Sequence, residues 1–193
     1  MKNNIIIPLI CVMSFWNAQV RIGEKSITAN PELTNTTSVL LEFGDTSDKG
    51  IILPYVETVP TGANDAKGGT LIFDISANSE YKVKVKNENA NWTDLSVESG
   101  YSSTLATAIK NPQASPLVDS STGKALIGAA SSTTEGVLVL ESADKAMVLP
   151  IVTSFSDIKN PSPGMMAFLK HPNDSTKHRL LIFNGQKWAF WKP

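Results

Sequence analysis

The sequence predicts an all-β protein made of two related small antiparallel β modules in tandem, joined by a Ser/Thr-rich linker. Three observations favour this fold class. Short apolar and β-branched runs recur between Gly, Pro, Asp and Asn residues, which is typical of strands separated by turns. The heptapeptide DKGIILP at Asp48 to Pro54 returns as DKAMVLP at Asp144 to Pro150. A Ser-, Thr- and Ala-rich stretch between the halves has no strand pattern.

Residues 1–18 have the composition of a secretory signal peptide. Lys2 precedes an apolar run from Ile5 to Trp16, and a polar Asn-Ala-Gln exit follows. The run is shorter than the roughly 20 residues that cross a bilayer, so we expect a cleaved leader and not a membrane span. Cleavage at Ala18 or Gln19 would give a secreted or cell-surface protein. The alternative is a buried N-terminal strand.

Cys11, the only cysteine in the chain, lies inside this leader. The mature protein would therefore have no disulfide, no thiolate metal site and no cysteine nucleophile. Ile10 stands directly before Cys11, where a lipid-attachment site needs a small residue. The formal net charge of −1 gives no basic excess, so a nucleic-acid partner is not expected.

The first half contains four runs with strand character. Pro54 cannot donate to a β ladder, so it should end a strand or lie at an edge. Gly68 precedes the third run, where glycine best tolerates a positive φ. The fourth run places Tyr81, Val83 and Val85 on one face and three lysines on the other, which predicts a half-exposed strand at a solvated edge. The four runs are Val39 to Phe43, Gly50 to Val56, Thr70 to Ile75 and Tyr81 to Asn87.

The second half repeats these signals. Pro150 again follows an apolar run, and Gly164 again precedes one. Asn184-Gly185 is a strong hairpin signal and predicts a tight turn between two strands. The second set of runs is Val137 to Glu141, Met147 to Val152, Met165 to Leu169 and Arg179 to Trp191.

An offset of 96 residues relates the two halves, as the separation of Lys49 from Lys145 shows. A match of this kind indicates one structural unit used twice. We expect the modules over residues 20–97 and 125–193. Upstream, the match resumes after a slip of two residues. Positions matched without a gap are Leu53 and Leu149, Pro54 and Pro150, Val56 and Val152, Asn64 and Asn160, Gly68 and Gly164, and Trp92 and Trp188.

Residues 98–124 form the expected linker. Their Ser, Thr, Ala, Gly and Pro content is typical of connecting segments. One short helix is expected at Leu105 to Lys110. The alternative is a long loop inside a single domain.

Each module should bury the inward-facing residues of its strands. Burial of one Leu or Phe contributes about 1.5–3 kcal/mol, so a module of this size would be marginally stable alone. The expected core residues are Leu40, Ile52, Leu53, Leu71, Phe73 and Trp92 in the first module, and Leu138, Val148, Leu149, Phe168 and Trp188 in the second.

The order of these motifs resembles a β-repeat module of secreted Bacteroidetes proteins that recurs in cell-surface and tail-fibre-like proteins. The resemblance implies an exported, β-rich surface or fibre component and assigns no reaction. The chain departs from the module where an arginine usually follows the proline, because Tyr55 and Ile151 stand there. The matching pieces are AQVRIG (Ala18 to Gly23), KGIILP (Lys49 to Pro54), GGTLIFD (Gly68 to Asp74), NANW (Asn89 to Trp92), KAMVLP (Lys145 to Pro150), GMMAFL (Gly164 to Leu169) and FNGQKW (Phe183 to Trp188).

No catalytic constellation is found in the sequence. His171 and His178 flank Asp174, but a third strong ligand is missing, and zinc sites usually take three or four ligands at tighter spacing. No GxSxG elbow or comparable frame positions a nucleophile. We therefore expect no enzyme activity, no catalytic residue, no metal and no cofactor.

Three tryptophans are the candidate binding residues of the mature chain. Aromatic faces are common platforms for ligands, which makes glycan binding a candidate function. Trp92 and Trp188 stand at matched positions, so they are expected to fill the same end of the two cores. Trp191 has no tryptophan counterpart in the first half and is the freest to contact a ligand. Ser175, in Asp-Ser-Thr, is a candidate O-glycosylation site because the tripeptide resembles the Bacteroidetes acceptor pattern.

These observations predict an exported, non-catalytic surface or extracellular structural/adhesion protein. It would act through protein contacts or self-assembly, either with other surface proteins or as a homo-oligomer or fibre. The alternative function is a glycan-binding, lectin-like surface module.

Overall fold

The computed structural model describes residues 20–23, 38–44, 48–62, 65–88, 91–113 and 123–192. These residues form strands, one α-helix, α1 (Ser103–Gln113), and two short 3-10 helices, so the all-β prediction is confirmed. The predicted signal peptide lies outside the described residues. In the described part of the chain, no helix is long and apolar enough to cross a membrane.

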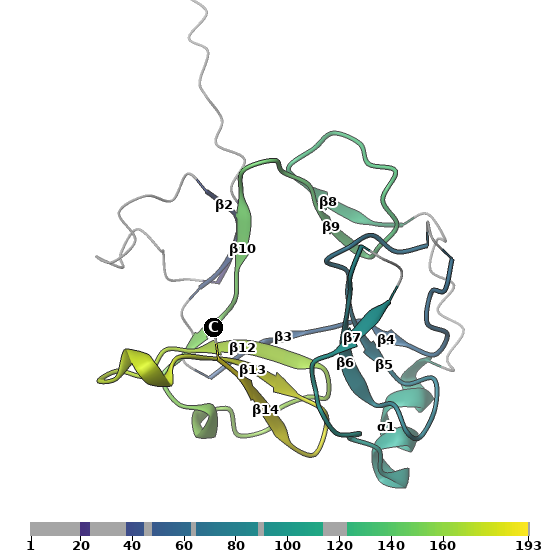
Figure 1. Cartoon of the computed structure of the whole chain (residues 1–193), viewed down its shortest axis with the longest axis vertical. Helices are drawn as coiled ribbons and strands as arrows, with labels where there is room; N and C mark the ends of the chain where they lie inside the picture. The colour runs from purple at the N-terminus through teal and green to yellow at the C-terminus, as the bar shows by residue number, and fades with distance from the viewer. Residues whose placement is uncertain are drawn as a thin grey trace, which may run out of the picture.

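The strands of the described residues make four sheets, which we name A to D (Figure 1). Sheet A orders β1 (Val20–Ile22), β2 (Val39–Phe43) and β10 (Ala146–Val148). Sheet B orders β11 (Ile151–Val152), β12 (Met165–Leu169), β13 (Arg179–Phe183) and β14 (Trp188–Trp191), and β3 (Ile51–Ile52) also pairs with β12. Sheet C orders β4 (Tyr55–Val56), β5 (Leu71–Asp74), β6 (Lys82–Lys86) and β7 (Trp92–Asp94). Sheet D pairs β8 (Ala125–Ile127) with β9 (Leu138–Leu140).

Sheets B and C have the same strand order. In sheet C, β4 pairs in parallel with β5, and β5, β6 and β7 follow as an antiparallel meander. In sheet B, β11 pairs in parallel with β12, and β12, β13 and β14 form the corresponding meander. All pairs in sheets A and D are parallel. The expectation of purely antiparallel modules is therefore wrong, because long connections bring several strands alongside in the same direction.

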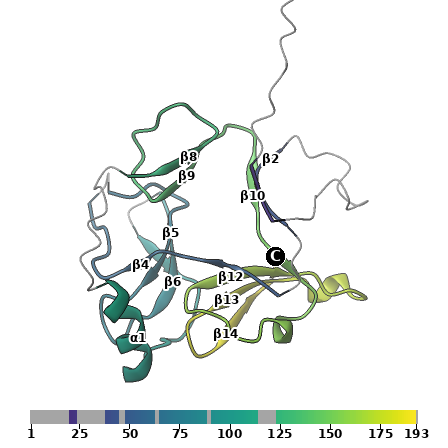
Figure 2. The ribbon, with the colours of Figure 1, turned by 180° about the vertical axis from the view of Figure 1, so that it is seen from behind.

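The two DK heptapeptides each connect two sheets. β3 pairs with β12 in sheet B, and the chain then passes Pro54 and continues as β4 in sheet C. β10 likewise pairs with β2 in sheet A, and after Pro150 the chain continues as β11 in sheet B. Figure 1 and the reverse view in Figure 2 show β3 running between sheets B and C. Both prolines follow the end of a strand, as predicted.

A hydrophobic cluster joins sheets B and C. Phe73 and Val83 of sheet C pack in it with Met166 and Ile182 of sheet B. Phe73, Val83 and Ile182 are completely shielded from solvent. A second cluster lies within sheet B and its connections, and includes Val152, Ile158, Ala167 and Leu181.

Helix α1 closes one side of the joined cluster. The N–H of Leu105 donates to Ser102 Oγ at 3.1 Å, which satisfies a main-chain donor in the first turn. Ile109 is buried in the cluster, and Leu105 packs against it. The helix expected at Leu105 to Lys110 therefore lies within α1, and it packs on sheet residues.

The structure corrects two predicted core positions. Ile52 is 53% exposed and Leu138 is 46% exposed, whereas the neighbouring Leu53 and Val139 are buried. Successive residues of a strand face opposite sides, so an error of one residue exchanges the inner and outer sets. Leu40, Leu53 and Phe73 are buried as predicted. Half-buried residues of the predicted core are Leu71, Trp92, Val148, Leu149, Phe168 and Trp188.

The lysine-rich strand β6 is not a solvated edge, because β5 and β7 pair with it on both sides. Lys84 binds two carboxylates, and Lys86 is buried with its ammonium 5.5 Å from the centre of the Trp92 ring. The alternation was predicted, but the partners that cover the lysine face come from other parts of the chain. Gly164 has a positive φ of 73°, as expected, whereas in the first half the positive φ falls on Gly69 and not on Gly68.

Candidate binding groove

A surface groove of about 450 Å³ runs between β14 and the segment from Ser96 to Glu98. Its walls come from opposite halves of the chain. The groove is a shallow, open depression and not an enclosed cavity. The lining residues are Ser96, Val97, Glu98, Asn184, Lys187, Trp188, Ala189, Phe190 and Trp191.

Asn184 fixes one end of the groove. Gly185 has a φ of 100°, which lets the chain reverse between β13 and β14. Asn184 Oδ1 accepts hydrogen bonds from the N–H groups of Gln186 and Lys187 at 2.9 and 2.7 Å. Asn184 Nδ2 donates to the carbonyl oxygen of Glu98 at 2.9 Å, so the hairpin turn is tied to the opposite wall.

Trp191 fixes the other end. Its indole Nε1 donates to the carbonyl oxygen of Leu95 at 2.6 Å. Between the two ties, Lys187 Nζ lies 2.6 Å from Glu98 Oε2 on the exposed rim. The hydrogen bond and positive charge of Lys187 lower the pKa of the Glu98 carboxyl. The polar side chains of the groove are thus bonded to one another or to main chain, and the remaining lining is largely apolar.

Val97 projects from the wall opposite β14. Its φ is 68°, and the N–H of Glu98 donates to the carbonyl oxygen of Ser96 at 2.8 Å, which closes a three-residue turn around it. A β-branched residue in this region of φ is strained. The side chain of Val97 is 71% exposed, so burial of that side chain does not compensate for the strain.

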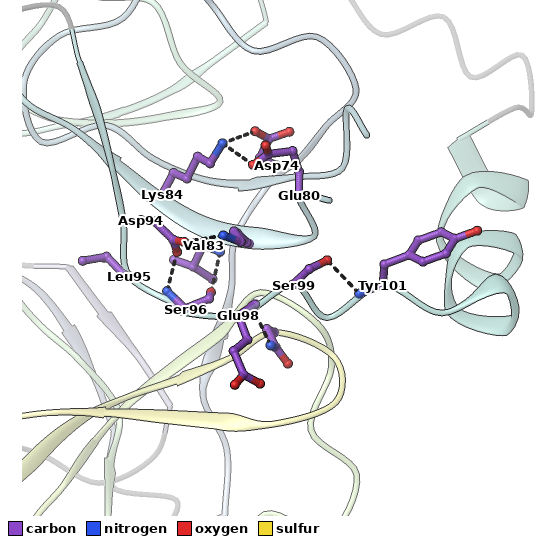
Figure 3. A network of polar contacts seen from close by, with 12 residues as sticks. Asp74, Glu80, Val83, Lys84, Asp94, Leu95, Ser96, Glu98, Ser99 and Tyr101 are labelled. Carbon is purple, nitrogen blue, oxygen red and sulfur yellow. Dashed lines mark hydrogen bonds and ion pairs between the residues drawn. The ribbon is translucent and has the colours of Figure 1, made fainter. Parts of the chain in front are cut away.

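Ser96 anchors this turn to sheet C (Figure 3). Ser96 Oγ accepts from the N–H of Val83 at 2.7 Å, and the N–H of Ser96 donates to Asp94 Oδ1 at 2.7 Å. Ser96 is buried although it lies in a loop. The anchor therefore holds the Val97 turn in place beside the groove.

A partly buried ionic network supports the same sheet (Figure 3). Lys84 Nζ lies 2.7 Å from Asp74 Oδ2 and 2.5 Å from Glu80 Oε2. Burial raises the pKa of Asp74, but hydrogen bonds from Lys84 and Ser76 outweigh burial and leave that pKa below its usual value. The network stabilises the start of β6, from which the chain leads through β7 to the Val97 turn.

Four exposed apolar side chains form an aromatic patch at the groove, which we define as Val97, Phe155, Phe190 and Trp191. Phe155 and Phe190 make an edge-to-face contact with ring centres 5.3 Å apart. Their exposed fractions are 43% and 47%, and Trp191 is 39% exposed. Exposed apolar side chains that gather at a groove are candidates for contact with a partner.

Two of the three predicted tryptophans line the groove, and Trp92 does not. Trp92 Nε1 donates to the carbonyl oxygen of Pro60 at 3.2 Å. Trp188 is half-buried and packs on Phe183 with ring centres 5.0 Å apart. Val97, Phe155 and Phe190 were missed by sequence reasoning, because one valine in a loop and two separate phenylalanines carry no local signal of exposure.

The residues from Asp174 to His178 do not line the groove. Ser175 is exposed at the start of a 3-10 helix. Asp174 Oδ1 accepts from Thr176 Oγ1 and Thr176 N–H at 2.6 and 3.0 Å, and these bonds with those from Lys177 lower the pKa of Asp174 to about 2. The His178 ring packs against Phe168. In the described ranges, no group of three or more His, Cys, Asp and Glu side chains could hold a metal ion.

Comparison of the chain with protein-family models, with curated proteins and with solved structures gave no match. The groove and its aromatic patch are therefore the features from which a function is inferred. They combine exposed apolar rings with a neighbouring Lys187–Glu98 ion pair.

Proposed function

We propose that the protein is an exported, non-catalytic surface or extracellular structural/adhesion protein that acts through protein contacts. The observation that carries this proposal is the aromatic patch beside the groove. Aromatic residues are enriched at protein interfaces, and a few well-packed ones contribute most of the binding energy. Partners are other surface proteins or further copies of the chain.

Contacts within the patch support this proposal. Trp191 donates a hydrogen bond to Leu95, Phe190 packs on Phe155, and a three-residue turn encloses Val97. Side chains that are already ordered lose little conformational entropy when a partner binds. A partner that binds the patch would thus bury apolar surface with a small loss of conformational entropy.

The proposal includes two related modules in tandem. The identical strand order of sheets B and C supports it, as do the two heptapeptides that each connect two sheets. The resemblance of the sequence to secreted surface and fibre modules agrees with an exported protein. The leader-like composition of residues 1–18 agrees with export as well.

The test is adhesion by a deletion strain complemented with variants. Phe190→Ser removes an exposed ring and should lower cell-surface adhesion and biofilm formation toward the level of the deletion. Val137→Ser is the matched control, because Val137 is 64% exposed and lies outside the patch. Unchanged adhesion in the deletion, together with hydrolase activity in the purified protein, would overturn the proposal.

Glycan binding is the second candidate function. Trp188 and Trp191 line the same groove, and aromatic faces are common platforms for ligands. Titration with a panel of mono- and oligosaccharides should then shift the tryptophan fluorescence of wild-type protein but not of Trp191→Ala. No shift with any sugar would leave protein contacts as the function of the groove.

We also propose Ser175 as an O-glycosylation site. Its exposed position supports access by a transferase. Intact mass of the protein purified from its native host should exceed the polypeptide mass, and Ser175→Ala should remove the excess. An unmodified native protein would exclude the modification.

A further inference from the structure

The two meanders differ in one strand, and this difference points to a partner. β12 of sheet B has β11 and β3 on the side away from β13. In sheet C, β4 pairs with β5 as β11 pairs with β12. Among the described residues, however, no strand pairs with β5 as β3 pairs with β12. The inference rests on the proposed relation between the two modules.

The contact of β3 with β12 is the template. Ile51 pairs with Met166, and the N–H of Leu53 donates to the carbonyl oxygen of Gly164 at 3.2 Å. Gly50 lies against this strand so closely that a Cβ atom would come within 2.6 Å of the Met166 carbonyl oxygen. Only glycine fits there without a shift of main chain.

Leu71 of β5 corresponds to Met166 of β12. Leu71 faces Val85 on the next strand, as Met166 faces Ile182. The N–H of Phe73 donates to the carbonyl oxygen of Pro54, so the main-chain groups of Phe73 point toward β4. Along a strand, the main-chain groups of every second residue point to the same edge. The N–H and C=O of Leu71 therefore face the unfilled side of β5.

The chain's own second heptapeptide cannot fill this place in the same way. Ala146 stands where the first heptapeptide has Gly50. A Cβ atom on Gly50 would lie too close to the Met166 carbonyl oxygen. By the same geometry, the Cβ atom of Ala146 would lie too close to the Leu71 carbonyl oxygen. β10 instead pairs with β2 in sheet A.

We propose that the edge of β5 at Leu71 binds an extended segment of another protein, with a glycine followed by two aliphatic residues. The segment would add to β5 as β3 adds to β12, by main-chain hydrogen bonds at the strand edge. Among the described residues of a second copy, the segments of this kind are already used: β3 pairs with β12 and the Gly-Val-Leu segment at residues 136–138 lies against β8, while β10 carries Ala146. The partner is therefore a different polypeptide.

The test uses the mature full-length protein and a fluorescent peptide with the sequence of residues 48–56, DKGIILPYV. The peptide should bind, and the exchange of the Leu71 amide with deuterium should slow on binding. The same peptide with alanine in place of its glycine should bind about tenfold more weakly or not at all. A peptide with an N-methyl group on its first isoleucine loses one main-chain donor and should also bind about tenfold more weakly.

Three results would contradict the proposal: no binding of the glycine peptide, equal binding of the alanine peptide, or slowed exchange only at Met165 and Met166. The last would mean that the peptide replaces β3 on its present strand. Sedimentation of the protein with and without the peptide tests the choice of partner, because self-association that the peptide abolishes would contradict a different polypeptide. Adhesion of the Phe190→Ser variant does not depend on β5, so failure here and failure of the proposed function are distinguishable.

Discussion

Val97 combines a strained main chain with an exposed apolar side chain. A β-branched residue with a φ of 68° is disfavoured by about 1–3 kcal/mol relative to a relaxed conformation. Its neighbours Ser96 and Glu98 hold the turn through bonds to Val83 and Asn184. The surrounding hydrogen bonds keep Val97 in this strained conformation beside the groove. We infer that Val97 serves contact with a partner and not stability.

The substitution Val97→Gly should therefore separate stability from adhesion. Glycine accepts positive φ without strain, so the free energy of unfolding should rise by about 1 kcal/mol, while adhesion should fall because the patch loses a side chain. Urea denaturation and the adhesion assay measure the two effects. Val137→Gly is the control: Val137 is exposed with no positive φ recorded, and glycine there should not stabilise the protein. A Val97→Gly protein less stable than wild type would contradict the strain argument.

Asp74 should make the protein sensitive to acid. Its folded-state pKa lies below the 3.8 of the unfolded chain, so its contribution is fully present above about pH 4 and is lost as the pH falls through the folded value. Asp74→Asn should lower the free energy of unfolding at pH 7 by about 1–3 kcal/mol, because Lys84 loses a buried partner. The variant should also lose less stability than wild type below pH 4. Urea denaturation at pH 7, 4 and 3 measures the free energy of unfolding of both proteins. An equal loss in the two proteins between pH 7 and pH 3 would refute the prediction.

At the scale of elements, Gly50 determines where β3 lies. The closest main-chain approach to it is the Met166 carbonyl oxygen, which cannot move without disturbing β12. Gly50→Ala should destabilise the protein by about 1–3 kcal/mol and speed amide exchange in β3 and at the start of β12. Ala146→Gly is the matched control in the second heptapeptide and should cost less than about 1 kcal/mol. Equal effects of the two substitutions would argue against distinct roles for the heptapeptides.

The strands themselves could be predicted from sequence, but their neighbours could not. Val39 to Phe43 and Met165 to Leu169 are strands with the predicted bounds, because β-branched and apolar runs between turn residues are local signals. The exposure of Ile52 depends on which sheet β3 joins, and β3 joins the sheet of the other half. The aromatic patch has the same cause: Phe155 and Phe190 meet through tertiary contacts that no periodicity records.

The groove was partly accessible from sequence. The lack of a tryptophan counterpart predicts Trp191 as a contact residue, and Trp191 lines the groove and is 39% exposed. The repeat predicts equivalent positions for Trp92 and Trp188, yet Trp92 does not line the groove. Their cross-strand partners differ: Trp92 lies under the Lys86 ammonium, whereas Trp188 packs on the Phe183 ring. Equivalent positions in a repeat thus need not have equivalent surroundings.

At the scale of the whole molecule, the two halves share one core. The cluster around Phe73 receives Ile109 from α1 and Met166 and Ile182 from sheet B, all of which lie beyond residue 97. Each such side chain contributes about 1.5–3 kcal/mol when buried. Together they contribute an amount comparable with the whole net stability of a typical domain, about 5–15 kcal/mol.

Residues 20–97 alone should therefore not fold, although they contain the whole of the first proposed module. The fragment keeps sheet C but loses the residues that cover Phe73 and the strand on which β3 lies. Circular dichroism should show no cooperative urea transition for the fragment and a single one for residues 20–193, because the shared core couples the sheets. Mixing the fragment with residues 98–193 should restore a cooperative transition. A fragment that unfolds cooperatively by itself, at the midpoint of the full chain, would show that the contacts between the halves add little and that each module is an independent domain.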